Sequence, residues 1–287
     1  MKIIKLVSTA VLILASYTSF AQIGMKLALN NQSYIKYEKI YAKVVLMNQS
    51  GNPIIFGLNP NLKGNIKFEI ETISGSVPKP LNNNYKVEGK VILQGEKETF
   101  IIPLTSIYDF PGEGRYKVKA IVEHSNFSTS YQSNYIYFTI AKGHIIWSTI
   151  VGVPISEEPG GEKVIDKRKY IIVRYFDGND KIYCLKVEDE KYVYGVAKLG
   201  IDIGTQKPEC KVDRFSRLHV LVQTSSKIYS YFIYDINCHL EKSVVYRKFI
   251  ESVPMLVENK ESGKIEVVGG IKAKEGLHYQ EYDEAPY

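Results

Sequence analysis

The sequence predicts an all-β protein, and two observations support this prediction. The 287 residues include 22 Tyr and 11 Phe but one Trp, and Val and Ile are frequent, a composition typical of pleated, half-buried strands. Apolar and polar side chains also alternate with a period of two in many segments. Beyond residue 21, no segment has the i, i+3, i+4, i+7 apolar spacing of an amphipathic helix.

The first 21 residues have the pattern of a secretory signal peptide. Lys2 and Lys5 come before the apolar segment 6–14, and Ser19-Phe20-Ala21 supplies small residues where a signal peptidase cleaves. A transmembrane anchor is the rival interpretation, but the uncharged segment is at the short limit for crossing a bilayer and contains polar residues. We therefore expect cleavage after Ala21 and a secreted or periplasmic mature protein without a transmembrane segment.

The charge of the chain gives no sign of a nucleic-acid partner. The formal net charge is +6, and removal of the signal peptide would take away two lysines and no acidic residue. Lys and Arg are scattered singly, without the basic runs that mark a nucleic-acid-binding tail. The length is sufficient for two domains, each with its own core.

Residues 22–143 are predicted to form a β-sandwich. Apolar and charged residues alternate through 66–71, which places one face inward and one in water. Segments 42–46 and 54–56 lie on either side of the turn sequence 48–52, which predicts a strand, a turn and a partner strand. About seven short strands are typical of two packed sheets, and the later ones are expected near 100–102, 116–122 and 135–140.

Three segments of this region, 44–54, 92–96 and 111–120, resemble bacterial immunoglobulin-like modules. In those modules a Gly-x-Tyr sequence enters a late core strand, so the resemblance implies that Tyr116 is a structural tyrosine near a sheet corner. It also implies an immunoglobulin-like β-sandwich with a spacer or adhesive role. Some modules of this kind are protease inhibitors, so protease inhibition is retained as an alternative.

Residues 144–165 are predicted to be a linker. Val153-Pro154 and the Pro, Gly and Glu residues of 157–162 cannot continue a β-ladder, and such clusters mark domain boundaries. Trp147 lies just before this cluster. It could be a platform for a ligand, but we expect it to pack at a contact between the domains.

Residues 166–287 contain an internal repeat followed by a polar C-terminal tail. The pattern from Asp166 to Tyr183 recurs from Asp213 to Tyr229, with the two Lys-Ile-Tyr triplets 46 residues apart, and a degenerate third copy follows at 255–268. This period resembles propeller-type β-meander repeats. The copies are too few to close a ring, so we expect a β-meander or partial-propeller module whose exposed sheet edges could pair in an oligomer. The second unit is expected to have strands near 217–223, 228–235 and 240–249.

Tyrosines are the one abundant feature that could serve binding. Exposed aromatic rows on a sheet can stack against sugar rings or contact a protein, although Tyr is also an ordinary half-buried strand residue. The candidate binding residues are Trp147, Tyr183, Tyr192, Tyr194, Tyr229, Tyr231 and Tyr234.

The three cysteines, Cys184, Cys210 and Cys238, form no Cys-x-x-Cys pair, so no zinc site or other metal site is expected. In an oxidising compartment they permit one disulfide. We expect it between Cys210 and Cys238, because the residue before one strand and a turn two strand-ends later lie at the same edge of a meander.

No catalytic motif is present, and no cofactor is expected. Asp166 and Asp213 occupy equivalent repeat positions and are expected to cap turns, while His219 has no catalytic partner nearby in the sequence. The predicted function is non-catalytic binding of a protein or glycan of the cell envelope. The main alternative is a hydrolase acting on carbohydrate through Asp166, Asp213 or His219.

Overall fold

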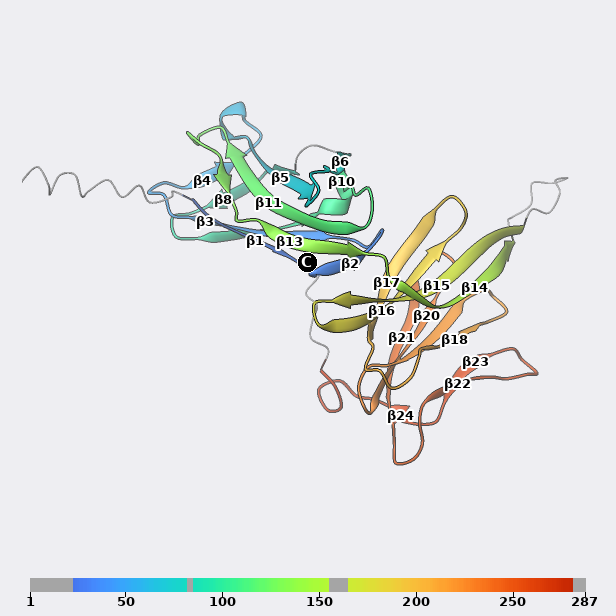
Figure 1. The fold of residues 1–287 in the computed structure, drawn as a ribbon. Coiled ribbons are helices and arrows are strands. Elements are labelled where there is room, and N and C mark those ends of the chain that lie inside the picture. The colour runs from blue at the N-terminus through green and yellow to red at the C-terminus, as the bar shows by residue number, and fades with distance from the viewer. Residues whose placement is uncertain (1–22, 82–84, 155–164, 281–287) are drawn as a thin grey trace, which may run out of the picture.

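A computed structural model of the chain describes residues 23–81, 85–154 and 165–280. These residues form 24 strands, two short 3₁₀-helices and no α-helix, so the prediction of an all-β fold is confirmed (Figure 1). The predicted signal peptide, the Pro/Gly/Glu cluster at 157–162 and the last seven residues lie outside the described residues.

Two sheets share one core in the first module, as the alternating polarity predicts. In the strand that contains 66–71, Ile66, Phe68 and Ile70 are buried while Glu69 is exposed. The smaller sheet consists of β1 (Ile23–Leu29), β3 (Tyr41–Asn48) and β9 (Lys97–Pro103). The larger sheet has the order β2 (Ser33–Ile35), β13 (Ile136–Ala141), β11 (Gly114–His124), β5 (Gly64–Thr72) and β7 (Tyr85–Val87), with β12 (Tyr131–Gln132) beside β11.

The inward faces of both sheets meet in a single hydrophobic cluster, and short elements close its ends. Within it Tyr116 stacks on Phe138, with ring centroids 5.2 Å apart, and its hydroxyl donates to the carbonyl oxygen of Gly112 at 2.6 Å. The closing elements are β4 (Ile54–Phe56) paired with β8 (Lys90–Ile92), β6 (Lys79–Pro80) paired with β10 (Tyr108–Asp109), and the 3₁₀-helices η1 (Pro60–Leu62) and η2 (Leu104–Ser106).

One predicted pairing in this module is wrong. The strands at 42–46 and 54–56 both exist, but β3 pairs with β1 and β9, whereas β4 pairs with β8. The buried side chain of Asn48 explains the difference, because its Nδ2 donates to the carbonyl oxygens of Asn52 and Ile92. These bonds turn the chain away from β3 instead of folding it back as a hairpin.

The second module consists of two antiparallel meanders, and the internal repeat corresponds to them. Each Lys-Ile-Tyr triplet lies at the start of the third strand of its sheet. The first meander is β14 (His144–Pro154), β15 (Ile165–Asp177), β16 (Asp180–Glu188) and β17 (Val193–Ile201). The second is β18 (Glu209–Val212), β19 (Leu218–Gln223), β20 (Ile228–Tyr234) and β21 (Leu240–Arg247), extended by β24 (Ile271–Lys272); the predicted strands of this unit are therefore confirmed.

The two meanders pack on each other, and a hairpin covers the second one. One hydrophobic cluster combines β15 and β16 residues such as Tyr170 and Leu185 with β19 residues such as Val220. A separate cluster joins β20 to the hairpin of β22 (Met255–Glu258) and β23 (Ile265–Val268), which contains the degenerate third copy of the repeat. This hairpin has two strands, whereas each of the two meanders that contain the other copies of the repeat has four.

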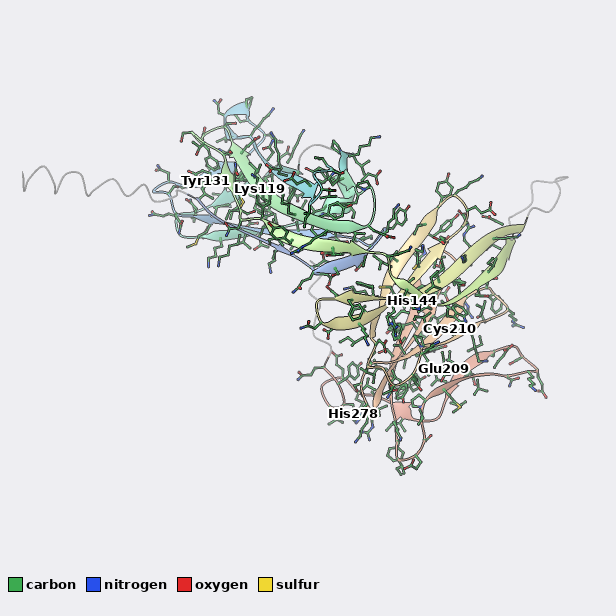
Figure 2. All side chains as sticks on the ribbon, viewed as in Figure 1. Lys119, Tyr131, His144, Glu209, Cys210 and His278 are labelled. Atoms are coloured by element: carbon green, nitrogen blue, oxygen red, sulfur yellow. The ribbon has the colours of Figure 1, made fainter. Side chains whose placement is uncertain are left out.

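The segment predicted as a linker is a strand over most of its described length. Residues 144–154 form β14 and pair with β15, because Pro154 lies at the end of the strand where it breaks no ladder. Gly143 therefore separates the modules, with β2 of the first in contact with β15 of the second. The side chain of His144, the first residue of β14, lies on the second module near this junction (Figure 2).

Candidate functional site

Most of the predicted row of surface tyrosines is buried. Tyr183, Tyr229, Tyr231 and Tyr234 are at most 4% exposed. They belong to β16 and β20, which are inner strands of their meanders and are covered by other elements. The prediction that these four rings form an accessible binding surface is therefore wrong. The four side chains pack in the hydrophobic cores of the second module.

Trp147 also has a packing role, as expected, but in a different place. It is half-buried and packs against the cluster between the two meanders, next to the irregular pairing of β14 at Ile145. The buried cluster that joins the modules instead contains Ile35, Val173 and Tyr175. The expected contact of Trp147 between domains is thus corrected to a contact within the second module.

Tyr192 and Tyr194 are the two predicted binding residues that line a common cleft, of about 670 Å³. Tyr192 is 65% exposed and Tyr194 is half-buried. The cleft, named here the Tyr192 cleft, lies between the first part of β15 and the turn from β16 to β17, with the exposed Ile150 of β14 at its side.

The turn that presents Tyr192 is built by Asp189. One carboxylate oxygen of Asp189 accepts hydrogen bonds from the backbone amides of Lys191 and Tyr192, both at 2.7 Å. The backbone of Asp189 also donates to the carbonyl oxygen of Tyr192 at 2.9 Å. Short acidic side chains favour such turns because they bond amides two or three residues later. The ring of Tyr192 consequently extends from a fixed backbone.

Arg168 connects the two sides of the cleft. Its side chain is only 10% exposed, and its Nη1 donates to Asp166 Oδ2 at 2.5 Å and to Asp189 Oδ2 at 3.4 Å. Its guanidinium lies over the ring of Tyr194, 3.9 Å from the centroid, and the hydroxyl of Tyr194 donates to Asp189 at 2.5 Å. The buried Arg168 Nε has no hydrogen-bond partner among the described residues.

The pKa values of two aspartates in this cleft are lowered by their hydrogen-bond partners. The hydrogen bond from Tyr194, together with those from the Tyr192 and Lys191 amides, lowers the pKa of Asp189 to about 2. The bond from Arg168 lowers the pKa of Asp166. Asp166 therefore pairs with an arginine on its own strand, and the expected turn-capping role is corrected for this residue.

The charges that line the Tyr192 cleft balance. Four basic side chains face four acidic ones, so no net charge favours an ionic ligand. Fixed donors and acceptors beside aromatic rings suit a neutral ligand with many hydroxyl groups, such as a saccharide. The basic residues are Lys167, Arg168, Lys169 and Lys191, and the acidic residues are Asp166, Glu188, Asp189 and Glu190.

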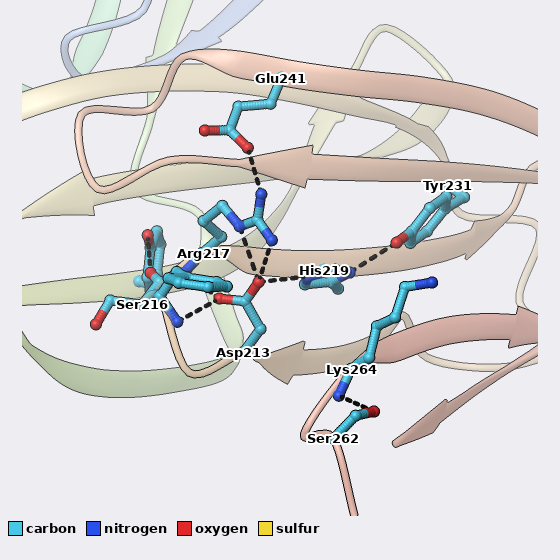
Figure 3. A network of polar contacts seen from close by, with 10 residues as sticks. Asp213, Ser216, Arg217, His219, Tyr231, Glu241, Ser262 and Lys264 are labelled. Carbon is cyan, nitrogen blue, oxygen red and sulfur yellow. Dashed lines mark hydrogen bonds and ion pairs between the residues drawn. The ribbon is translucent and has the colours of Figure 1, made fainter. Parts of the chain in front are cut away.

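A second polar network lies in the other meander, around Asp213 and His219 (Figure 3). His219 is 3% exposed, with Nε2 3.3 Å from Asp213 Oδ2 and Nδ1 2.6 Å from the Tyr231 hydroxyl. Because a carboxylate only accepts, Nε2 carries the hydrogen and Tyr231 donates to Nδ1. Arg217 also donates to Asp213, through Nε at 2.8 Å, and to Glu241 at 3.2 Å.

The side chains of the Asp213 network hydrogen-bond one another. Burial lowers the pKa of His219 and raises that of Tyr231 to about 12, so both groups are neutral at neutral pH. Burial opposes ionisation of Asp213, but the hydrogen bonds from Arg217, His219 and the Phe215 amide together outweigh it, and the pKa of Asp213 is lowered. Asp213 also accepts from the amides of Phe215 and Arg217, which confirms its turn-capping role.

The three cysteines are free thiols, and the predicted disulfide between Cys210 and Cys238 is not formed. Cys210 lies on β18, opposite Val220, while Cys238 follows β20. Since β19 separates these strands, they are roughly 10 Å apart, beyond the Cα separation of about 7 Å that a disulfide permits. Burial raises the pKa of both thiols to about 12.

Within the described residues, no group of His, Cys, Asp and Glu side chains is arranged to hold a metal ion. The described part of the chain also contains no helix with the length and hydrophobicity needed to span a membrane.

Sequence reasoning missed Arg168 and Asp189, which organise the Tyr192 cleft. A local signal exists for both. Asp166 and Arg168 are two residues apart on one strand, so their side chains share a face. Asp189 begins an Asp-Glu-Lys sequence between two apolar strands, a pattern that favours a turn. The contact between these two segments depends on the pairing of β15 with β16 and has no local signal.

Comparison with known proteins found no match: no family model, no curated protein and no solved structure is similar to this chain.

Proposed function

We propose that this chain is an exported, non-catalytic binding protein of the cell envelope that recognises a glycan through the Tyr192 cleft. The observation that carries the proposal is the joint placement of an exposed tyrosine, a half-buried tyrosine and a charge-balanced lining in which hydrogen bonds hold Asp166, Arg168 and Asp189 in place. Aromatic rings can cover the apolar face of a sugar while the polar groups bind its hydroxyls. Binding by this cleft requires no turnover.

Export and architecture are part of the same proposal. Lys2, Lys5, the apolar segment 6–14 and Ala21 support a cleaved signal and a secreted or periplasmic location. The bond from Tyr116 to Gly112 supports an immunoglobulin-like arrangement of the first module, since a tyrosine corner has this form. The two successive four-stranded meanders support a propeller-like second module.

Self-association is proposed to depend on the edges of the meanders. Among the described strands, β17 and β18 each pair on one side only within their sheets, and such edges can pair with a second chain. Light scattering of the purified protein tests this part: a mass above that of one chain is expected, and a strict monomer contradicts it.

The test of glycan recognition is a binding panel with a matched variant. The purified protein is immobilised and exposed to neutral hexasaccharides of glucose, xylose, mannose and N-acetylglucosamine. At least one is expected to bind saturably, and Tyr192→Ala is expected to weaken it at least about tenfold, the effect of losing an anchoring aromatic residue. Tyr37→Ala is the control, because Tyr37 is 58% exposed but lies in the first module.

Two results contradict this proposal. One is that no member of the panel binds saturably, and the other is that Tyr37→Ala weakens binding as much as Tyr192→Ala. Saturable capture of an envelope protein through Tyr192, with no saccharide bound, assigns the cleft to a protein partner instead.

A carbohydrate hydrolase is the second candidate function. The observation that favours it is the Asp213, His219 and Tyr231 network, which lines a separate cleft of about 560 Å³. Its test is prolonged incubation of the hexasaccharides with the protein, followed by mass spectrometry. Cleavage that disappears in Asp213→Asn supports a hydrolase, whereas recovery of every saccharide intact supports binding without turnover.

A further inference from the structure

A third cleft, of about 660 Å³, lies at the junction between the two modules. It is formed by the ends of β2, β13 and β15, with Gly143 and His144 at the connection. The Tyr192 cleft lies at the other end of β15. Six residues separate Arg168 from Arg174 on this strand, which corresponds to roughly 20 Å. The junction cleft is therefore a separate site.

The charges that line the junction cleft differ from those of the Tyr192 cleft. Arg115 of the first module and Arg174 of the second both line it, with His144 beside them, and no aspartate or glutamate is among the lining residues in the described chain. Arg115 is exposed and forms no ion pair with another described residue. Arg174 is paired with a carboxylate outside the lining, so Arg115 supplies the positive charge of the cleft that has no ion-pair partner, and this charge favours an anionic ligand.

Arg174 is held in place by a carboxylate behind it. Its Nη1 lies 3.1 Å from Asp202 Oδ2, and the Asp202 side chain is 2% exposed while that of Arg174 is 37% exposed. A guanidinium has five N–H donors, and the contact with Asp202 engages one of its nitrogens. The remaining donors suit a planar carboxylate, which arginine binds with two parallel hydrogen bonds.

Each module also contributes an exposed aromatic ring to the cleft. Tyr137 of β13 is 51% exposed, and Phe176 of β15 is 59% exposed. The guanidinium of Arg115 lies over the Tyr137 ring, 5.2 Å from the centroid. Rings of this kind can contact the apolar face of a sugar, so the cleft combines carboxylate-binding and ring-binding groups.

The geometry of the cleft is fixed by contacts between the modules. Asp177 accepts hydrogen bonds from the backbone amides of Gln32 and Ser33, at 3.0 and 2.7 Å. Ile35 packs among the buried residues of β15 and β16. A cleft that is ordered before binding loses less conformational entropy when the ligand enters.

We propose that the junction cleft binds a carboxylate-bearing saccharide, with Arg115 and Arg174 on the carboxylate and Tyr137 and Phe176 against the sugar rings. This site is independent of the glycan recognition proposed for the Tyr192 cleft.

Titration calorimetry with tetragalacturonate at low ionic strength tests the proposal. Saturable binding is expected, weakened at least about tenfold in Arg115→Gln through the loss of a charge-assisted hydrogen bond. The control arginine is Arg214, which is likewise exposed and lies over an exposed ring, that of Phe215 at 4.8 Å. Arg214→Gln is expected to leave the affinity for tetragalacturonate unchanged.

Two further ligands distinguish the contribution of the carboxylate from that of the sugar ring. Tetragalactose has the rings without the charge, and tetraglutamate has the charge without the rings. Both are expected to bind at least about tenfold more weakly than tetragalacturonate. Equal binding of tetragalactose overturns the role of the carboxylate, and equal binding of tetraglutamate overturns the choice of a saccharide. Absence of saturable tetragalacturonate binding, or an unchanged affinity in Arg115→Gln, overturns the site itself, whatever the outcome for the Tyr192 cleft.

Discussion

Arg168 shows how a charged side chain can be nine-tenths buried in the second module. A buried charge requires partners, and Arg168 has the carboxylates of Asp166 and Asp189 and the ring of Tyr194. These groups come from β15, from the turn after β16 and from β17. The arrangement therefore fixes the position of Tyr194 relative to the turn that presents Tyr192.

The lowered pKa of Asp189 predicts a pH-dependent contribution to stability. Its pKa is about 2 in the folded protein and about 3.9 in an unfolded chain. The ionised carboxylate therefore stabilises the fold above about pH 4, and this stabilisation is lost as the pH falls toward about 2. Asp189→Asn is expected to be less stable than the wild type at neutral pH, with the difference shrinking between about pH 4 and 2.

Urea unfolding of both proteins at about pH 7, 4 and 2.5, values that run from well above both pKa values into the interval between them, measures this difference. Glu190→Gln is the control, because Glu190 is exposed on the same turn. A difference between wild type and Asp189→Asn that does not change with pH contradicts the assigned role of the carboxylate.

The cysteines give a second prediction for individual residues. Burial raises the pKa of Cys210 and Cys238 to about 12, so the unreactive thiol form predominates at neutral pH. Iodoacetamide is expected to modify the folded protein slowly, and to modify all three cysteines after unfolding without reductant. Intact-mass spectrometry counts the added carbamidomethyl groups, and a single added group reveals a disulfide.

At the scale of elements, period-two alternation predicted the strands well because each sheet buries one face. The inward residues of β5 and β11, such as Ile66 and Val118, are buried as expected. The pairing of strands was harder to predict. The turn sequence after β3 is typical of a hairpin, but the buried Asn48 binds the carbonyl oxygen of Ile92, a contact 44 residues away that has no local signal.

The candidate site could be predicted only in part for the same reason. Tyr192 and Tyr194 were identified from their residue type, and they line the cleft. Tyr183 and Tyr231 have the same residue type and the same strand pattern, yet they are buried. Which tyrosines remain accessible depends on the packing of one meander on the other and of the β22–β23 hairpin on β20.

Gly64, the first residue of β5, gives a prediction about packing between elements. A Cβ atom there would lie 2.3 Å from Cδ1 of Phe56, a ring that is 1% exposed on β4. Gly64→Ala is expected to lower the free energy of unfolding by about 1–3 kcal/mol through overpacking. Urea unfolding measures this loss. Gly51→Ala is the control, since nothing lies within 4 Å of a Cβ there; equal effects of the two substitutions contradict the packing argument.

At the scale of the whole molecule, the two modules are joined by specific contacts as well as by the chain. Asp177 binds two backbone amides of the first module, the Tyr175 hydroxyl lies 3.4 Å from Glu38 Oε2, and Ile35 packs into the second module. We expect the modules to unfold together, because disrupting one removes partners of the other.

Asp177→Ala tests this coupling. It leaves the amides of Gln32 and Ser33 without their acceptor, which is expected to cost about 1–3 kcal/mol and to lower the melting temperature by a few degrees. Differential scanning calorimetry is expected to show one transition for the wild type. Asp180→Ala, an exposed position at the start of β16, is the control, and two separate transitions in the wild type contradict the coupling.

The central claim is that saccharides bind at the Tyr192 cleft, and amide chemical-shift mapping by NMR tests it most directly. The neutral hexasaccharide that binds best in the panel is added to the isotopically labelled protein until saturation. The account predicts that the largest shifts fall on residues 188–194 and on the first part of β15. Shifts centred on Asp213 and His219, or no shifts at saturating saccharide, would contradict it.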